Sequence, residues 1–460
     1  MGTRTSLKTV VMGVTAAALL AVMFSYSPLQ TGSQKDPGAK PGTTPEIDGF
    51  TLVKGKKPVR KQTRMTVPKP QPIPDYINRG ISWLVEAQHS SGGWGAGSHS
   101  NQRNLDPSKV KLDPATTAFA GMALLRAGHT PNEGTYRDSV RKATSFLVTV
   151  VEDYNKPGPR ITDMTGTQPQ AKLGQLVDTT MTTHFLSRLL TVLPKKDPLH
   201  DRVSLALDKC LVKIQGSQQE DGSWSGGGWA SVLQSSLGTT ALELAQVAGK
   251  QIDTGKLAKA RRYQKGNFNV RTGSVDASAG AGVALYAFAG AQRAGAGEAR
   301  AARDLIATAK DEGQLGDDAP VSEANLRKIG LKPEKAKLLA DADQAAKAQI
   351  ARLDDESLLR GFGNNGGEEF LSYLMTSESL VITGGDAWKQ WNQKIIARLS
   401  KVQNPDGSWN GHHCISSPVF CTAAVVQCAT TDHDAGLLIQ IAERAAQVKD
   451  GAGSKTVSNR

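Results

Sequence analysis

Aromatic residues are scarce in this chain of 460 residues. They make up 5% of it, while 47 residues are glycine. This composition disfavours an aromatic-rich β-sandwich and favours closely packed helices joined by glycine-rich turns. Hydrophobic residues at 39% and charged residues at 21% still allow a sizeable buried core, so we expect a largely globular chain.

Cysteine is also rare, with four residues at positions 210, 414, 421 and 428. Cys421 and Cys428 lie seven residues apart on a predicted helix. That spacing separates them by about two turns, which is too far for a disulfide. Cys414 and Cys421 can pair only if a turn lies between them, and the alternative is that these thiols are buried and free.

Acidic residues are missing from residues 53–64, which contain six cations in a chain of formal net charge +12. This run is either a solvated tether or a contact for an anionic lipid or polymer. The remaining positive charge is spread out and accompanies no zinc-finger, helix-turn-helix or single-strand-binding signature. We therefore expect no nucleic-acid partner.

The N-terminus carries an uncharged run over residues 9–26, preceded by Arg4 and Lys8. Its 18 residues are few for a bilayer span and many for the core of a signal peptide. Residues 1–26 are thus a signal anchor or a cleaved signal peptide. Because the cations precede the run, both alternatives place the rest of the chain outside the cytoplasm, on the periplasmic or cell-surface side.

The amino-acid composition of the chain changes after this segment. Residues 27–73 are rich in Pro, Lys and Gly and lack helical periodicity, which predicts a disordered linker. Residues 74–445 alternate apolar helical segments with Gly, Pro and Asp, and residues 446–460 form a tail. Inside the helical part, residues 296–360 are rich in Ala, Lys and Asp and are predicted to be a helical insertion.

Internal repeats run through the helical part. Residues 83–88, 210–215 and 398–403 align, with a shared leucine at positions 84, 211 and 399. Leu147 fits the same frame, so the intervals are 63, 64 and 188 residues, close to multiples of one repeat length. A turn containing Gly and Trp follows three of these helices, at residues 88–94, 219–224 and 403–409. There we expect Gln to cap a helix end, Gly to supply a positive φ and Trp to pack across the junction.

Small-residue segments follow the repeat helices and predict a second, inner set of helices. Six such segments are present, which is the number needed to close a double ring. The chain is therefore predicted to be all-α, an α/α toroid of about six helical hairpins behind the anchor and linker. The segments cover residues 116–119, 182–185, 239–242, 281–284, 376–379 and 421–424.

The repeats resemble those of a known superfamily. Residues 79–88 followed by Gly92-Gly93-Trp94 are similar to the repeat motif of squalene and oxidosqualene cyclases, and the likeness extends over roughly residues 74–445. The resemblance to the prenyltransferase and squalene-oxidase repeat superfamily implies the toroid of terpenoid cyclases and protein prenyltransferases. It does not imply an activity, because these turns lie outside the catalytic cavity in that family.

The chain departs from this family at the residues that carry chemistry. Class II cyclases protonate an alkene with the middle Asp of Asp-x-Asp-Asp-Thr-Ala, but residues 113–118 place Ala115 and Thr116 where the two later acids belong. Residues 421–424 keep the Cys-Thr-Ala of oxidosqualene cyclases without their acids. No carboxylic acid is left to deliver the proton, so we expect no cyclase of the known kind. The family's zinc motif Asp-x-Cys is also absent, and we expect no metal and no cofactor, although residues 412–414 with Cys421 contain His and Cys.

Acidic residues on the predicted inner helices remain as candidates for function. A glycine-rich loop at residues 361–367 leads into a helix with Glu368, Glu369 and Glu378. The first two either cap the helix or serve a ligand, whereas Glu378 is a candidate acid, base or partner of a cationic group. The candidate catalytic residues are Glu378, Glu369 and Asp276, and the candidate ligand-binding residues are Asp113, Asp178, His184 and Glu368.

Three of these candidates, Asp113, Asp178 and Asp276, have helix capping as their alternative role. In a toroid, however, the starts of the inner helices can converge on one opening, so a ring of caps can also be a binding site. The leading functional hypothesis is an exported, membrane-tethered toroid that binds a hydrophobic small molecule or an envelope polymer in its centre. The alternative is an enzyme that acts on an isoprenoid lipid or an envelope polymer through its carboxylates.

Overall fold

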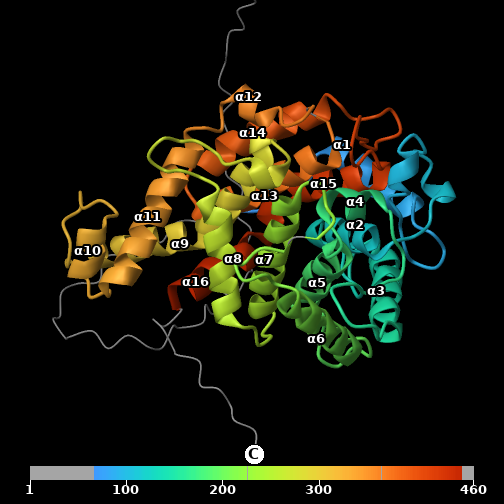
Figure 1. Ribbon diagram of the computed structural model, residues 1–460, viewed down its shortest axis with the longest axis horizontal. Coiled ribbons are helices and arrows are strands. Elements are labelled where there is room, and N and C mark those ends of the chain that lie inside the picture. The colour runs from blue at the N-terminus through green and yellow to red at the C-terminus, as the bar shows by residue number, and fades with distance from the viewer. Residues whose placement is uncertain (1–66, 225, 364, 448–460) are drawn as a thin grey trace, which may run out of the picture. The chain divides into compact units, whose positions relative to one another are not determined.

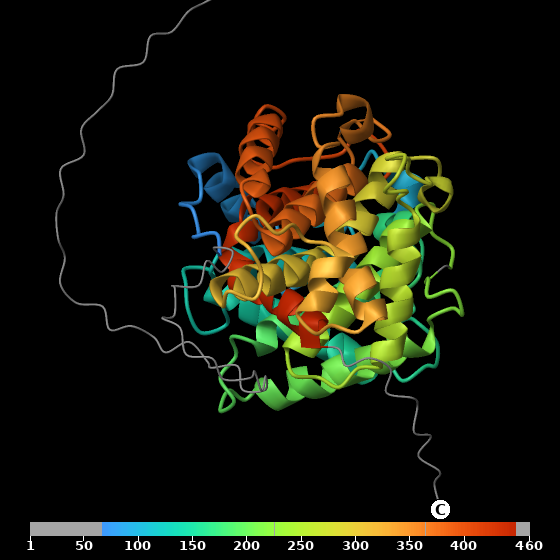
Figure 2. The same cartoon turned by 90° about the vertical axis from the view of Figure 1, so that its left-hand side faces the viewer.

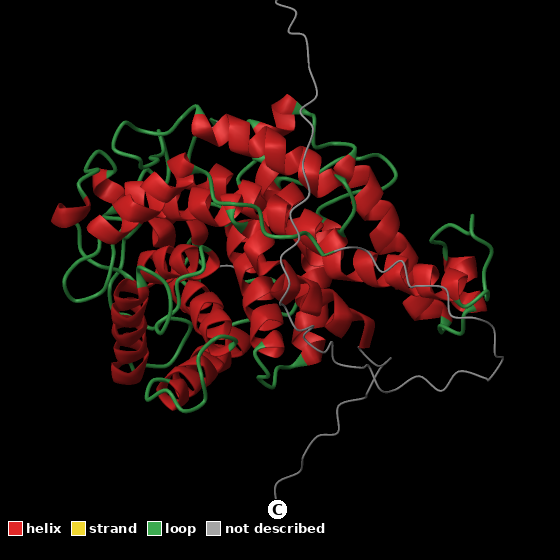
Figure 3. Ribbon diagram, turned by 180° about the vertical axis from the view of Figure 1, so that it is seen from behind, coloured by secondary structure: helices red, strands yellow, loops and turns green. Residues whose placement is uncertain are grey.

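The computed structural model describes residues 67–224, 226–363 and 365–447 (Figure 1). The predicted anchor, most of the predicted linker and nearly all of the predicted tail lie outside these residues. In the described part the regular elements are helices, and β-structure is limited to isolated bridges (Figure 3). The all-α prediction is confirmed. No helix within the described ranges is both long and apolar enough to cross a bilayer.

Six helices form an inner ring in the described part of the chain. Each contacts the next in the order of the sequence, and the last contacts the first, which closes the ring. Five of the six predicted inner segments lie inside these helices, whereas of residues 281–284 only Ala284 belongs to the fourth helix. The inner helices are α2 (Pro114–Arg126), α5 (Val177–Leu190), α7 (Ser231–Val247), α9 (Ala284–Asp311), α13 (Gly367–Thr383) and α15 (Pro418–Ala429).

A second layer of helices packs on the outside of this ring (Figure 2). All residues of α2 and α13 are buried, whereas the outer helices bury one face only. This difference explains why the inner segments consist of small and apolar residues without helical amphipathicity. The outer layer contains α1 (Asp75–Glu86), α3 (Arg137–Asp153), α6 (His200–Gly216), α8 (Thr254–Gly266) and α14 (Ala387–Ser400).

The three Trp turns share one set of contacts. In the first, the Trp94 indole donates to the carbonyl of Leu84 at 2.7 Å, and the Trp94 backbone N–H donates to Thr117 Oγ1 of the next inner helix at 2.9 Å. The Gln88 amide donates to the carbonyl of Gly92, which has a φ of 95°. Each turn thus ties an outer helix to an inner one, and the same three contacts recur around Trp224 and Trp409.

These contacts correct the alignment of the second repeat. Trp224 bonds to the carbonyl of Ile214, which makes Ile214, and not Leu211, the counterpart of Leu84. The turn glutamine is Gln218, whose amide donates to the carbonyl of Gly222. The register predicted from the sequence was therefore wrong by three residues here, because a leucine one helical turn away occupies the same helix face.

The predicted insertion at residues 296–360 has a different start from the one expected. Helix α9 continues without a break from Ala284 to Asp311, so the ring helix itself extends into the insertion. Helix α11 (Pro333–Ile350) packs along this extension, and α10 (Glu323–Lys328) contacts both. Residues such as Ile306, Leu326 and Leu339 form a separate apolar cluster there.

Further elements pack against the ring helices or lie in the connections between them. Helix α4 (Gln168–Leu173) lies against α5 and α7, and α16 (Ala435–Gln447) lies against α7, α9 and α13. The remaining elements are α12 (Glu356–Leu359) and the 3-10 helices η1 (His99–Asn101), η2 (Pro107–Lys109), η3 (Ser278–Gly280) and η4 (Thr431–Asp434). All four cysteines are buried free thiols.

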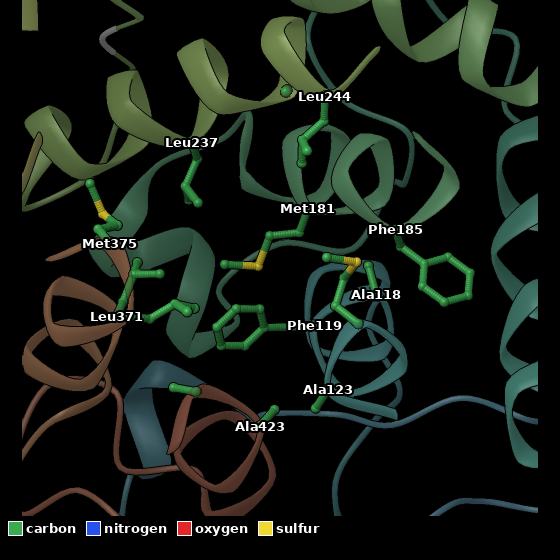
Figure 4. Close-up of a cluster of buried hydrophobic side chains, with 14 of the residues drawn as sticks. Ala118, Phe119, Ala123, Met181, Phe185, Leu237, Leu244, Leu371, Met375 and Ala423 are labelled. Carbon is green, nitrogen blue, oxygen red and sulfur yellow. The ribbon is translucent and has the colours of Figure 1, made fainter. Parts of the chain in front are cut away.

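The centre of the ring is apolar. Phe119, Met181, Leu237, Leu371 and Met375 come from four different inner helices and point toward one another (Figure 4). Each of these side chains is at most 5% exposed. This apolar layer separates two polar regions, one at each end of the inner helices.

Candidate functional site

The inner helices run in the same direction, so their first turns meet at one end of the ring. The carboxylate of Asp178, in the first turn of α5, accepts a hydrogen bond from Ala115 N in the first turn of α2. Tyr286 near the start of α9 contacts Glu369 near the start of α13. We call this the N-terminal end of the ring, and the end near Arg126, the last residue of α2, the C-terminal end.

Asp113 and Asp178 have structural partners for all of their carboxylate oxygens. Asp113 caps α2 by accepting from Thr116 N at 2.7 Å, and its other oxygen accepts from Ala96 N at 2.8 Å. The sequence analysis gave capping of its own helix as one role for Asp178, but the structure does not show this cap. Asp178 accepts instead from Ala115 N of α2 and from the side-chain amide of Gln170. Burial, and next the charge of Asp113, raise the pKa of Asp178 to about 7. Neither carboxylate has an oxygen left for a ligand.

Glu368 and Glu369 are fully buried at the same end but are only partly satisfied. One oxygen of Glu369 accepts from the Tyr286 hydroxyl at 2.6 Å and from Phe362 N at 2.9 Å. One oxygen of Glu368 accepts from Ile415 N at 3.2 Å. Glu368 Oε1 and Glu369 Oε2 have no hydrogen-bond partner. Burial, and next the charge of Glu369, raise the pKa of Glu368 to about 7.

His413 lies beside the unpartnered oxygen of Glu369. Its Nε2 is 3.8 Å from Glu369 Oε2, which is beyond hydrogen-bond range, and neither ring nitrogen has a hydrogen-bond partner. Burial lowers the pKa of His413, although the charge of Glu369 opposes this shift. The imidazole is therefore largely neutral at pH 7. Its side chain remains 20% exposed, unlike the two carboxylates behind it.

Glycines of the loop that precedes α13 pack tightly around Glu369 and His413. A Cβ on Gly366 would lie 2.6 Å from both Glu369 Oε2 and the His413 ring, and one on Gly363 would lie 2.8 Å from His413 Nε2. Gly361 has a φ of 60°, and a Cβ there would lie 2.7 Å from Glu369 Oε1. Glycine is needed at these positions because any side chain would displace Glu369 or His413.

Two exposed aromatic side chains lie over this end of the ring. Phe362 is 57% exposed and Trp229 is 36% exposed, and their ring centroids are 5.5 Å apart at an angle of 79°. Phe362 also meets the His413 ring edge-on at 5.0 Å. The ammonium group of Lys172 lies 4.9 Å from the centroid of the Trp229 ring. We call Trp229, Phe362 and His413 the aromatic rim.

The sequence analysis did not single out the aromatic rim. Phe362 and His413 lay within segments that were considered, but neither was named as a functional candidate. Trp229 was missed, although it follows three glycines at residues 226–228, a pattern that could have drawn attention to it. A Cβ on Gly228 would lie 2.6 Å from Gly174 N, so this glycine allows the Trp229 loop to approach α4 closely.

Glu378 lies at the opposite end, in a chain of buried ion pairs. Its two oxygens bind Arg126 at 2.7 Å and Arg293 at 3.2 Å. Burial works to raise the pKa of Glu378, but the two guanidinium groups outweigh it and hold the pKa below its ordinary value. The expected acid is thus an anion bound by two cations, a poor proton donor. In order, the chain runs through Arg188, Asp434, Arg126, Glu378, Arg293, Glu243 and Arg261.

The other two candidates do not join the N-terminal cluster. His184 lies on α5 near the charged chain, and its Nε2 is bonded to the carbonyl of Leu237 at 2.8 Å. Burial lowers the pKa of His184 to about 4, so it is neutral at pH 7. Asp276 is exposed on a turn before α9, where it accepts from Ser278 N. Its expected place at the start of an inner helix was wrong, because that helix begins at Ala284.

No metal site is recognisable among the described residues: no group of three or more His, Cys, Asp and Glu side chains has a suitable arrangement. His413 and Cys414 lie close to the two glutamates, but burial raises the pKa of the Cys414 thiol to about 12 and keeps it protonated. Cys414 also adopts a φ of 58°, which is rare for a residue with a side chain. The candidate site is therefore the aromatic rim together with Glu368 and Glu369.

Comparisons with known proteins give remote matches among solved structures. No family model and no curated protein matches the chain. Among solved structures, the chain is similar to the apo form of the type II terpene cyclase MstE from Scytonema, with 14% identity, a TM-score of 0.41, and coverage of 79% of this chain and 98% of that chain. A variant of MstE in complex with its product merosterolic acid A gives 12% identity, a TM-score of 0.28, and coverage of 79% and 97%.

Proposed function

We propose that this protein is a ligand-binding toroid whose ligand docks on the aromatic rim. The observation that carries the proposal is the pair of exposed rings, Phe362 and Trp229, packed edge-to-face above two incompletely satisfied buried carboxylates. Large exposed aromatic side chains are typical of binding surfaces, because water solvates them poorly and a partner gains by covering them. Buried polar atoms without partners are rare, and those of Glu369 and His413 lie 3.8 Å apart at this end of the ring.

The proposal places binding at one end of the ring, and not in its centre as the sequence suggested. The central side chains are almost completely buried against one another. The residues aligned with the cyclase acids support binding in place of cyclisation. Ala115 and Thr116 lie in the first turn of α2, where their N–H groups bond to Asp178 and Asp113. Both carboxylates are buried and accept hydrogen bonds on both oxygens, so they hold the starts of the helices in place.

The binding can be tested with the full-length chain isolated from its own membranes. Native mass spectrometry should detect a bound species in the wild type that is lost from a Phe362→Ala, Trp229→Ala double variant. The matched control is Leu205→Ala, Val212→Ala, which removes two exposed apolar side chains from the outer helix α6. If the wild type carries no bound species, or the rim variant keeps it, the proposal fails.

We also propose that the toroid is tethered outside the cytoplasm by its N-terminal segment. The uncharged run at residues 9–26 and the preceding Arg4 and Lys8 support this orientation. The chain should stay in the membrane pellet after alkaline carbonate extraction, and added protease should digest it in intact spheroplasts. Recovery in the soluble cytoplasmic fraction would refute the tether, and the mass of the mature chain would separate an anchor from a cleaved signal.

A second candidate function is acid–base catalysis at the same site. It is favoured by Glu368, whose raised pKa keeps part of the population protonated near neutral pH beside the carboxylate of Glu369. A Glu368→Gln variant would then bind the ligand normally but leave it unconverted. Conversion at an unchanged rate in this variant would exclude Glu368 as the acid.

A further inference from the structure

The aromatic rim combines two apolar faces with polar groups at their edges. Phe362 is flanked by His413, and the His413 segment bonds through His412 N to the carbonyl of Asn365. Trp229 is flanked by Lys172, whose ammonium group lies over the Trp229 ring. A ligand that fits must therefore present apolar C–H groups and hydrogen-bonding groups side by side.

The charges at the rim disfavour a cationic ligand. The ammonium group of Lys172 already lies over the Trp229 ring, in the position that a ligand cation would occupy. Lys172 and the carboxylate of Glu369 offset one another, while burial keeps the His413 imidazole largely neutral. Binding of an uncharged ligand at this surface therefore has no electrostatic cost.

The size of the exposed apolar surface also restricts the ligand. Stable protein–protein interfaces bury about 1,200–2,000 Å² in total, far more than the two rings Trp229 and Phe362 can provide. A lipid chain would cover the two rings but would bring no hydrogen-bonding group to the ammonium group of Lys172 beside Trp229. A small ligand with many hydroxyl groups satisfies both restrictions.

We infer that the aromatic rim binds the neutral sugar units of an oligo- or polysaccharide, an inference that rests on the proposed function. A pyranose ring carries C–H groups on its faces and hydroxyl groups on its edges. The polarised C–H groups stack on the electron-rich face of Phe362, and a hydroxyl group at the ring edge accepts from the ammonium group of Lys172 beside Trp229. Glu369 acts as a positioning residue, because its one oxygen holds both Phe362 N and the Tyr286 hydroxyl.

Binding is tested by titrating the full-length chain with neutral hexasaccharides, cellohexaose and chitohexaose, by isothermal calorimetry in a detergent without a sugar headgroup. At least one of them should bind to the wild type. Phe362→Ala and Trp229→Ala should each weaken binding about three- to tenfold, as expected for the loss of one aromatic stacking contact. Phe362→Tyr keeps the ring and should restore wild-type affinity, while Leu205→Ala on α6 should have no effect.

The outcomes separate this inference from the proposed function. Binding that is weakened by both rim substitutions and restored by Phe362→Tyr supports the sugar site. If no hexasaccharide binds, or if the rim variants bind as well as the wild type, the sugar site is refuted. The proposed function still stands in that case if the species that co-purifies with the wild type is lost from the rim double variant, and it falls as well if none is found.

Discussion

The two ends of the inner ring both contain buried acids, but they satisfy them differently. At the C-terminal end, Glu378 has a guanidinium group on each oxygen, and so has Asp434. At the N-terminal end, Glu368 and Glu369 each keep one oxygen without a hydrogen bond. Leaving a buried polar group unpartnered costs about 1–3 kcal/mol, so the second arrangement sacrifices stability that the first retains.

This difference separates structural acids from functional ones. In the buried ion-pair chain every oxygen of Glu378 and Asp434 is paired, which fixes helix positions and leaves no acid oxygen for a ligand, although Arg293 Nη2 has no hydrogen-bond partner. A buried carboxylate with a free oxygen, next to exposed aromatic rings, retains bonding capacity that only another molecule or water can use. By this criterion Glu378, Asp113 and Asp178 belong to the framework, and Glu368 and Glu369 to the site.

The largest expected effect is on stability at the C-terminal end. A Glu378→Gln substitution removes the negative charge between Arg126 and Arg293 and leaves two buried guanidinium groups undercompensated. We expect the free energy of unfolding to fall by about 3–5 kcal/mol, measured by urea denaturation. Glu133→Gln, at an exposed position, serves as control and should change it by less than about 0.5 kcal/mol. A loss as small as in the control would show that the ion-pair chain does not hold the ring.

A packing change tests the N-terminal end. In Gly366→Ala the new Cβ would lie 2.6 Å from Glu369 Oε2 and from the His413 ring, so both side chains have to shift. We expect a destabilisation of about 1–3 kcal/mol, as for overpacking of a tight core, and weaker ligand binding. Gly216→Ala at the end of α6, where a Cβ meets nothing within 4 Å, should instead stabilise by about 0.5–1 kcal/mol. If both substitutions changed the free energy of unfolding equally, the loop would be able to rearrange around the new Cβ and would not hold Glu369 in place.

The fold was predictable because its signals are local. Trp94, Trp224 and Trp409 each sit in a turn whose Gly and Gln make the same backbone contacts, and such a pattern is visible in the sequence. The inner helices were recognisable from their small residues. The wrong alignment of Leu211 in place of Ile214 shows the limit of sequence patterns. Residues one helical turn apart lie on the same helix face, so the pattern of apolar residues does not distinguish them.

The site was less predictable, because the partners of an acid come from distant segments. Glu378 meets Arg126 across 252 residues and Glu369 meets Tyr286 across 83 residues, and no spacing rule gives either contact. The glycine-rich loop and the two glutamates after it could be singled out from the sequence alone. Which of the acids keeps a free oxygen could not, because that depends on every neighbour in the folded chain.

The pH dependence of stability offers a smaller and more specific test. Glu368 has a pKa of about 7 in the folded chain against 4.5 for an ordinary Glu. When folding raises the pKa of a carboxyl group, the group costs no stability at a pH below its pKa in the unfolded chain. Stability is lost as the pH rises from that pKa to the higher pKa of the folded chain. Glu368→Gln should therefore match the wild type at pH 4 and be more stable by about 1–3 kcal/mol at pH 8.

The measurement compares the unfolding free energies of the variant and the wild type from pH 4 to pH 8. The difference isolates Glu368, since groups such as His184, with a pKa lowered to about 4, titrate alike in both proteins. Glu133→Gln should give a curve parallel to that of the wild type. A parallel curve for Glu368→Gln would mean that its carboxyl group is solvated in the folded protein, and the contrast with Glu378 would then disappear.

The smallest expected effect on stability is at the residue with the largest expected role in binding. Phe362 is 57% exposed, so Phe362→Ala removes little buried surface and should change the unfolding free energy by less than about 0.5 kcal/mol. Its backbone N–H to Glu369 is kept by any residue other than proline. A variant that is as stable as the wild type but binds its ligand more weakly would show that the ring of Phe362 serves the ligand alone. A loss of several kcal/mol would instead make Phe362 part of the framework, like Glu378, and the two ends of the ring would no longer differ in kind.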